Sequence, residues 1–178
     1  MEEDMKNMKY YRTPFTEEDI DGLNVGDMVM FSGYIFCGRD TVLPKVVRMI
    51  EDGSIKDSGI DLQGGVIFHT AVSQAGVGPT SSNKAEIKDS FLGLSRGGIK
   101  LHLGKGEISR ETVEILNREH SVYAVIPPIT ALLGDRTFES RVLAFPEEGI
   151  EALHLLKVDR YPCIIAAAHG HSIYDREG

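Results

Sequence analysis

Short apolar runs alternate along the chain with segments whose apolar residues recur every three or four positions. The run from Met28 to Phe36 is rich in β-branched and aromatic residues and ends at Cys37 and Gly38, which predicts a buried strand. The next segment spaces its apolar residues as one face of a helix, with Asp40 as the expected cap. Further strands are expected at Gly64–His69, within Gly97–Gly106, and at Ser121–Ile126, Arg141–Phe145 and Cys163–Ala168.

Helices are expected between these strands. Thr16 and Asp19 have the spacing of a capping box, and Ser109 precedes an apolar helical face. Other helices are expected at Lys84–Leu94, Thr130–Leu133 and Gly149–Leu156. This alternation favours an α/β fold with a mixed or parallel sheet covered by helices over a bundle or a sandwich. We expect a single domain over residues 1–178, in which residues 1–15 form a polar N-terminal arm and 16–178 the folded body.

The composition narrows the class of protein. At 178 residues and 42% hydrophobic, the chain has enough apolar residues for one sizeable core. Its net charge of -8 argues against a nucleic-acid binder, because phosphate backbones attract clustered Lys and Arg. No apolar run approaches the roughly 20 residues of a membrane helix, and the first residues lack the apolar core of a signal peptide. A cytoplasmic protein with no membrane contact is therefore expected.

The cysteines and histidines do not predict a metal site in this chain. The two cysteines, Cys37 and Cys163, lie far apart in the sequence and outside any CxxC spacing. A cubane iron–sulfur cluster needs three or four thiolates, so we do not expect this chain to hold one by itself. His169 and His171 stand close together near the end of the sequence, but two imidazoles lack the third and fourth ligands of a site.

One candidate anion site is Gly38-Arg39-Asp40, where a predicted strand passes into a helix. A guanidinium at that junction stands beside unpaired helical N–H groups, and both attract carboxylates and phosphates. The alternative is that Asp40 only caps the helix while Arg39 is a solvated surface charge.

Two further segments could bind an anion. The loop Gly76–Lys84 combines glycines with three hydroxyl groups and one ammonium, although it lacks the Gly-Lys-Ser/Thr ending of a P-loop. In Gly104-Lys105-Gly106 the flanking glycines allow a lysine to approach a ligand closely. The alternatives are a Gly/Ser loop without function and an ordinary hairpin turn, respectively.

Taken in order, these motifs resemble the β subunit of the two-subunit class I fumarases and L-tartrate dehydratases, which is similar to the C-terminal domain of the single-chain enzymes. The resemblance extends over nearly the whole chain, although each motif is weak alone. The motifs are Arg12-Thr-Pro-Phe-Thr-Glu-Glu-Asp19, Val25-Gly-Asp27, Phe31-Ser-Gly-Tyr-Ile-Phe-Cys-Gly-Arg-Asp40, Gly78-Pro-Thr-Ser81, Gly104-Lys-Gly106 and Ala144-Phe-Pro-Glu-Glu-Gly-Ile-Glu-Ala-Leu153.

The resemblance implies both a fold and a division of labour. The fold would be a swivelling β/β/α domain like the mobile domain of aconitase, a mixed sheet flanked by helices. In this family a partner α subunit carries a [4Fe-4S] cluster that binds the substrate, and assemblies of two α and two β chains are common. The β subunit helps to bind a small dicarboxylate and to move its proton. The chain would then be active only with such a partner.

The resemblance also assigns roles to individual residues. Arg39 and Lys105 would bind substrate carboxylates, with Ser81 and Lys84 completing the binding set. Thr80 matches the hydroxyl that removes the proton next to a carboxylate. A threonine is a weak base, so it could act only where cationic groups stabilise its alkoxide.

This chain departs from the family pattern at several positions. Ser81, Lys84 and Ala85 replace the usual Thr, Arg and Met, and Leu43 stands where a His is common. The lysine matters most, because Arg binds a carboxylate with two parallel hydrogen bonds and Lys offers a point charge. The expected activity is fumarate hydratase, interconverting fumarate and (S)-malate. L-tartrate or another 2-hydroxy dicarboxylate is the alternative substrate, and a non-catalytic anion-binding paralogue remains a third possibility.

Overall fold

Five strands close into a small barrel in the computed structural model, which describes residues 8–39, 41–70, 72–73, 76–77, 84–126 and 137–174. Side chains are described over the same ranges except for 72–73, 76–77, 84–88 and 138. In spatial order the barrel strands are β2 (Met28–Gly38), β3 (Val66–His69), β6 (Leu101–Gly104), β7 (Val122–Val125) and β9 (Leu153–Ala168). The first four run parallel, and β9 closes the ring by pairing antiparallel with both β2 and β7.

Three further strands pair with the two long strands of the barrel, β2 and β9. β1 (Lys9–Arg12) lies parallel to β2, while β8 (Thr137–Ala144) and β10 (His171–Ser172) pair antiparallel with β9. A separate two-stranded ribbon is formed by β4 (Val72–Ser73) and β5 (Gly76–Val77). The architecture is mixed α/β, with a small mixed barrel and flanking helices.

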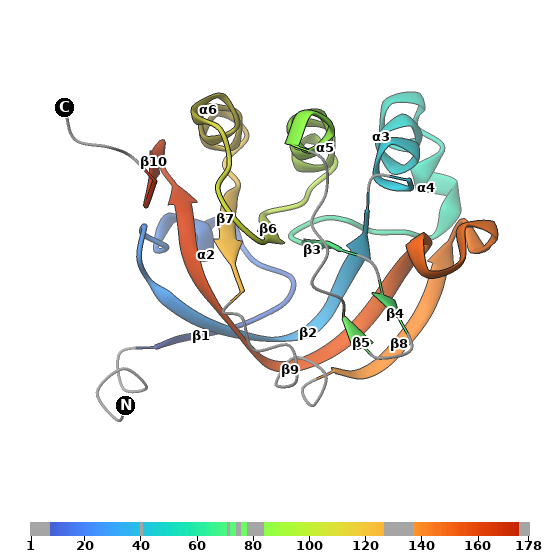
Figure 1. Ribbon diagram of the computed structural model, residues 1–178, viewed down its shortest axis with the longest axis horizontal. Helices are drawn as coiled ribbons and strands as arrows, with labels where there is room; N and C mark the ends of the chain where they lie inside the picture. The colour runs from blue at the N-terminus through green and yellow to red at the C-terminus, as the bar shows by residue number, and fades with distance from the viewer. Residues whose placement is uncertain are drawn as a thin grey trace.

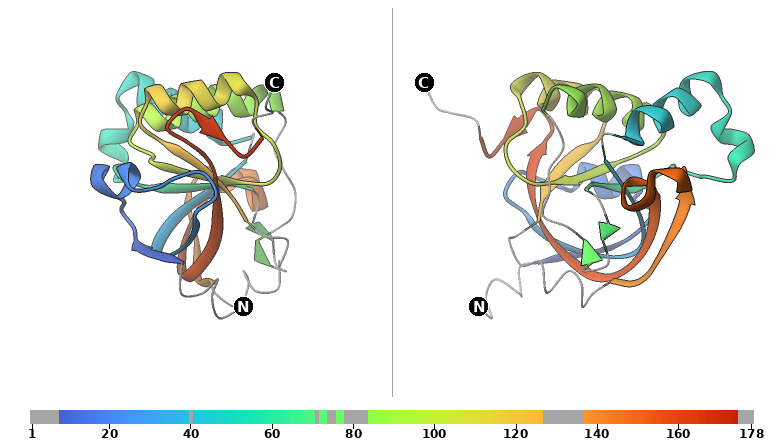
Figure 2. Two further views of the ribbon diagram at one scale, coloured as in Figure 1. Left: turned by 90° about the vertical axis from the view of Figure 1, so that its left-hand side faces the viewer. Right: turned by 45° about the vertical axis from the view of Figure 1, so that its right-hand side comes forward.

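Three helices lie side by side over the parallel strands. They are α3 (Leu43–Asp52), α5 (Lys84–Arg96) and α6 (Arg110–Arg118), and both further views keep them on one side of the barrel (Figures 1 and 2). The shorter elements are α2 (Glu17–Asp21), α4 (Ile55–Ser58) and the 3-10 helix η1 (Pro146–Glu151).

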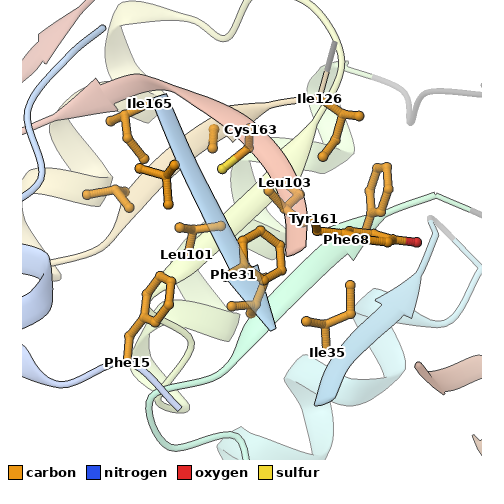
Figure 3. Packing of buried hydrophobic residues seen from close by; sticks show 14 of the residues in the cluster. Phe15, Phe31, Ile35, Phe68, Leu101, Leu103, Ile126, Tyr161, Cys163 and Ile165 are labelled. Carbon is orange, nitrogen blue, oxygen red and sulfur yellow. The ribbon is translucent and has the colours of Figure 1, made fainter. Parts of the chain in front are cut away.

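The alternation of side chains in the barrel strands produces two apolar layers. One set points into the barrel, where Phe31, Phe68, Leu103 and Tyr161 from four different strands pack together (Figure 3). The other set packs against the helices, as Ile67 does in a cluster with Val46 of α3 and Leu94 of α5. Because successive residues of a strand face opposite sides, the runs buried on both faces appear continuously apolar in the sequence.

The closing pair β2–β9 contains a bulge. The register shifts between Phe31, which pairs with Tyr161, and Gly33, which pairs with Val158. Gly33 has φ +125° and Arg160 has φ +51°, so both strands turn sharply at this point. A Cβ on Gly33 would lie 2.2 Å from Oγ1 of Thr13. Only glycine satisfies both the backbone angle and the close approach.

The structure confirms most of the expected local elements. Thr16 and Asp19 form the capping box of α2, and the hydroxyl of Ser109 accepts the backbone N–H of Thr112 at the start of α6. α5 begins at Lys84, as expected. The expected helix at Thr130–Leu133 lies outside the described residues. Asp40, the expected cap of α3, also lies outside them. The N-cap residue of α3 is Val42, which makes no side-chain hydrogen bond to the helix.

One expected helix was wrong. The segment Gly149–Leu156 is not a helix, because η1 ends at Glu151 and the chain then enters β9. The i, i+3 apolar spacing of this segment favours a helix, but the hydrogen bonds that its residues make with β2 hold it as a strand. Within the expected arm over residues 1–15, Lys9–Arg12 forms β1 and Phe15 is buried in the barrel core.

We expect Gly33→Ala to destabilise the protein by about 2 to 4 kcal/mol, since it combines an unfavourable φ with overpacking against Thr13. Gly53→Ala is the matched control, because Gly53 also has positive φ (+80°) but open space around its Cβ position. The control should cost about 1 kcal/mol. Urea unfolding followed by circular dichroism measures both, and equal losses would contradict the proposed role of the bulge.

Candidate active site

The carboxyl ends of the four parallel strands meet at one end of the barrel. Gly38 of β2 pairs with His69 of β3, and Gly104 of β6 pairs with Val125 of β7. The strands therefore end nearly level with one another. In parallel sheets this edge is where ligands bind, because the loops that follow the strands converge there. Arg39 and Lys105 are the first residues beyond two of these strands.

Arg39 and Lys105 follow strands whose inward-facing side chains form the barrel core. Cys37, Phe68 and Leu103 form one register row whose side chains belong to the core inside the barrel. Arg39, Thr70 and Lys105 follow two positions after these residues, directly beyond the ends of the three strands. We call this end of the barrel, marked by these three residues, the barrel mouth. Since β3 lies between β2 and β6, the backbones of Arg39 and Lys105 are about 10 Å apart by strand spacing.

Arg39 is positioned by an acidic residue from η1. Its Nη1 lies 3.6 Å from Oε1 of Glu151, and Oε2 of Glu151 accepts a hydrogen bond from Thr41 at 2.8 Å. A second ion pair, Lys45–Glu148 at 2.7 Å, also links α3 to η1. Arg39 is thus a partly buried, oriented cation, which argues against the alternative of a solvated surface charge.

The Gly104-Lys105-Gly106 turn is fixed by two tyrosines. The hydroxyls of Tyr123 and Tyr174 donate to the carbonyl of Gly106 at 2.9 and 3.1 Å. A Cβ on Gly104 would come within 2.8 Å of the Tyr123 hydroxyl, and Gly106 has φ +81°. Burial lowers the pKa of Lys105 below its ordinary value. The hairpin alternative is wrong, because β6 runs parallel to β7 and the chain between them forms α6.

A buried hydrogen-bonded chain lies beneath the mouth on the helix side of the sheet. Nε2 of His69 is 3.0 Å from Nδ1 of His102, and Nε2 of His102 is 2.8 Å from Oγ of Ser95. Phe91 of α5 packs against both rings. Burial lowers the pKa of His102 well below its ordinary value, so its ring is neutral at physiological pH. These hydrogen-bonded histidines were not predicted from the sequence, although a histidine inside an apolar strand is a signal for such a site.

Several expected site residues fall outside what the structure describes. Thr80, Ser81 and the side chain of Lys84 are among them, so their roles stay predictions. The backbone of Lys84 begins α5, the helix that follows the segment leaving β3 at the mouth. Leu43, at the position where the family often has His, is 1% exposed and packs between α3 and the sheet.

The cysteines are suited to packing and not to metal binding. Cys37 and Cys163 are both buried, and burial raises the pKa of the Cys163 thiol to about 12. The Cys37 thiol donates to the carbonyl of Thr70 at 3.2 Å. No cluster of three potential metal ligands occurs within the described ranges. His169 Nε2 instead lies 2.7 Å from the carbonyl of Leu23 and donates to it. None of the helices in the described part is both long and apolar enough to cross a membrane.

Comparison with known proteins gives a consistent set of relatives. Residues 1–177 match the family described as "Fumarase C-terminus". A putative L(+)-tartrate dehydratase subunit beta from Methanocaldococcus jannaschii is 28% identical, with 94% of this chain and 92% of the relative covered. The L(+)-tartrate dehydratase subunit beta of Escherichia coli is 25% identical over 93% and 86%. A putative class I fumarate hydratase from Geobacillus stearothermophilus is 27% identical over 92% of this chain, which spans only 33% of that relative.

Lys105 should lose its proton at a lower pH than a lysine side chain in water, because burial disfavours its ammonium form. As pH rises, the positive charge that Lys105 places at the mouth would therefore be lost earlier than the ordinary pKa of lysine implies. NMR titration of chain labelled with ¹³C at lysine Cε measures this directly, with Lys105→Met identifying the resonance and free lysine titrated in parallel as the reference. A Lys105 resonance that titrates together with free lysine would contradict the expectation.

Proposed function

The chain belongs to the fumarase C-terminus family of class I hydro-lyases, and from that membership we propose that it is the β-type subunit of a two-chain iron–sulfur hydro-lyase acting on a 2-hydroxy dicarboxylate. The observation that carries the proposal is that Arg39 and Lys105, 66 positions apart in the sequence, both lie directly beyond the carboxyl ends of parallel strands at the barrel mouth. Two cations held at one sheet edge suit a ligand with a carboxylate at each end.

L-tartrate is the first substrate to test. The relatives that match this chain along nearly their whole length are named tartrate dehydratase β subunits, whereas the chain spans about a third of its fumarase relatives. From the sequence motifs, fumarate and (S)-malate were the expected substrates. Those substrates remain the second candidate, since they share the two carboxylates that the mouth would bind.

Each mouth residue has a definite task in this proposal. Arg39 would grip one carboxylate through two parallel hydrogen bonds, with Glu151 keeping the guanidinium oriented until the substrate arrives. Lys105 would bind the second carboxylate as a point charge in a partly desolvated turn, where Coulomb attraction is stronger than in water. Lys84 and Ser81 would add polar contacts from the segment that precedes α5.

The reaction removes a proton from the carbon next to one carboxylate and a hydroxyl from the adjacent carbon, leaving a carbon–carbon double bond and water. We assign the proton to Thr80. Its alkoxide would need the field of the neighbouring cations, and Arg39, Lys84 and Lys105 would supply it. The reverse addition of water uses the same groups in the opposite order.

A [4Fe-4S] cluster does not fit the residues of this chain, which has two cysteines, both buried. We therefore place the cluster in an α-type partner, in keeping with relatives that are named as β subunits. The barrel with its helices on one side would be the swivelling β/β/α domain of that assembly, similar to the mobile domain of aconitase. Two α and two β chains in the cytoplasm are the arrangement we expect.

Co-expression with an α-type subunit should yield a brown, oxygen-sensitive complex that dehydrates L-tartrate, with malate and fumarate assayed in parallel. The chain alone should turn over none of the three. If the assembled pair binds these dicarboxylates, as a rise in melting temperature would show, but converts none, the protein is a non-catalytic anion-binding relative.

Thr80→Ala should remove dehydratase activity while leaving assembly intact, because it deletes the proposed proton acceptor without changing the mouth cations. We expect a loss of at least about 100-fold in kcat, the lower range for a general base. Thr80→Ser is the matched control and should keep part of the activity, since it retains the hydroxyl. Normal turnover by the alanine variant in gel-filtered complex would overturn the assignment.

A further inference from the structure

His154 lies at the barrel mouth although no motif pointed to it. It is the second residue of β9, where its register partner is Cys37 of β2. Leu156 and Val158, on the same face of β9, are buried in the barrel core. His154 therefore occupies the last position of that inward-facing row, at the end of the barrel where Cys37 contacts Thr70.

The ring of His154 has one hydrogen bond that fixes where its proton sits. Nδ1 lies 2.9 Å from the carbonyl oxygen of Ala152. A carbonyl only accepts, so Nδ1 must carry the proton, and in the neutral ring Nε2 is then an acceptor. The residue is only 7% exposed. Among the described residues Nε2 has no hydrogen-bond partner, and it is not one of the unpaired atoms sealed from solvent.

Register places His154 opposite Cys37, two residues before Arg39, and an acceptor at the end of the barrel that carries two cations would bind a different ligand group from the cations. A substrate carboxylate would pair with Arg39 or Lys105 and be repelled by the lone pair of Nε2, whereas a hydroxyl would donate to it. The Cys37 thiol in the same register pair donates to the Thr70 carbonyl, and its sulfur is a much weaker acceptor than an imidazole nitrogen. The mouth thus offers two positions for carboxylates and one buried position for a hydroxyl donor.

We propose that His154 Nε2 accepts a hydrogen bond from the substrate hydroxyl that is not eliminated, so that His154 selects dihydroxy dicarboxylates over monohydroxy ones. This inference rests on the proposed function. L-tartrate carries a hydroxyl on each central carbon and keeps one when the other leaves, whereas malate has none to spare. With malate bound, Nε2 of His154 would stay buried without a hydrogen-bond donor. The free-energy cost of that unpaired acceptor disfavours malate relative to L-tartrate.

The first test is a change in substrate preference in the assembled pair. His154→Leu removes the acceptor and should lower the ratio of kcat/KM for L-tartrate to that for malate by roughly tenfold, the value of one hydrogen bond. His154→Gln keeps an acceptor oxygen and should preserve most of the ratio. An unchanged ratio in the leucine variant, or equal losses for both substrates at unchanged melting temperature, would overturn the proposal.

The second test does not need turnover. Long-range ¹H–¹⁵N spectra of the full chain labelled with ¹⁵N-histidine report which ring nitrogen carries the proton, with His154→Gln identifying the resonances. We expect the Nδ1–H form, and in the assembled pair the Nε2 resonance should move with L-tartrate but not with succinate, which lacks a hydroxyl. An Nε2–H form, or equal shifts with both ligands, would refute the role of His154. Failure of the pair to turn over any dicarboxylate would instead count against the proposed function.

Discussion

The antiparallel pairing of β2 with β9 turns an open parallel sheet into a barrel, and the position of the candidate site depends on it. Without that pairing, β2, β3, β6 and β7 would present one face to the helices and leave the other uncovered. With it, the second face encloses a core of its own, whose aromatic members meet across the barrel in Figure 3. The bulge at Gly33 and Arg160 allows the long strands to bend enough for closure.

Closure also determines which residues meet at the mouth. Arg39 and Lys105 directly follow β2 and β6, and the pairing of β9 with β2 places His154 opposite Cys37, near the carboxyl end of β2. The ion pair between Arg39 and Glu151 draws η1 to this end as well. Binding groups for an anion are thus assembled by strand pairing, while the tyrosines that hold Gly106 keep one of them in place.

The sequence predicted those parts of the fold that depend on local interactions. Capping by Thr16 and Ser109, the start of α5 and the buried strand β2 follow from residues a few positions apart. Barrel closure could not be predicted, because it rests on contacts between segments more than a hundred positions apart. The same limitation explains the error at Gly149–Leu156, where local spacing favoured a helix and distant pairing produced a strand. It also concealed His154, whose place depends on being in that strand.

The connectivity of the barrel has a consequence for how the protein is made. The ribosome releases β2 early and β9 late. More than a hundred residues must therefore be synthesised after β2 before β9 can pair with it and close the barrel. During that interval the inner faces of β3, β6 and β7 lack their cover. Folds dominated by such distant contacts form slowly and expose apolar surface while they fold. Newly synthesised chains therefore expose the apolar inner face of the sheet until β9 has been made and has paired with β2.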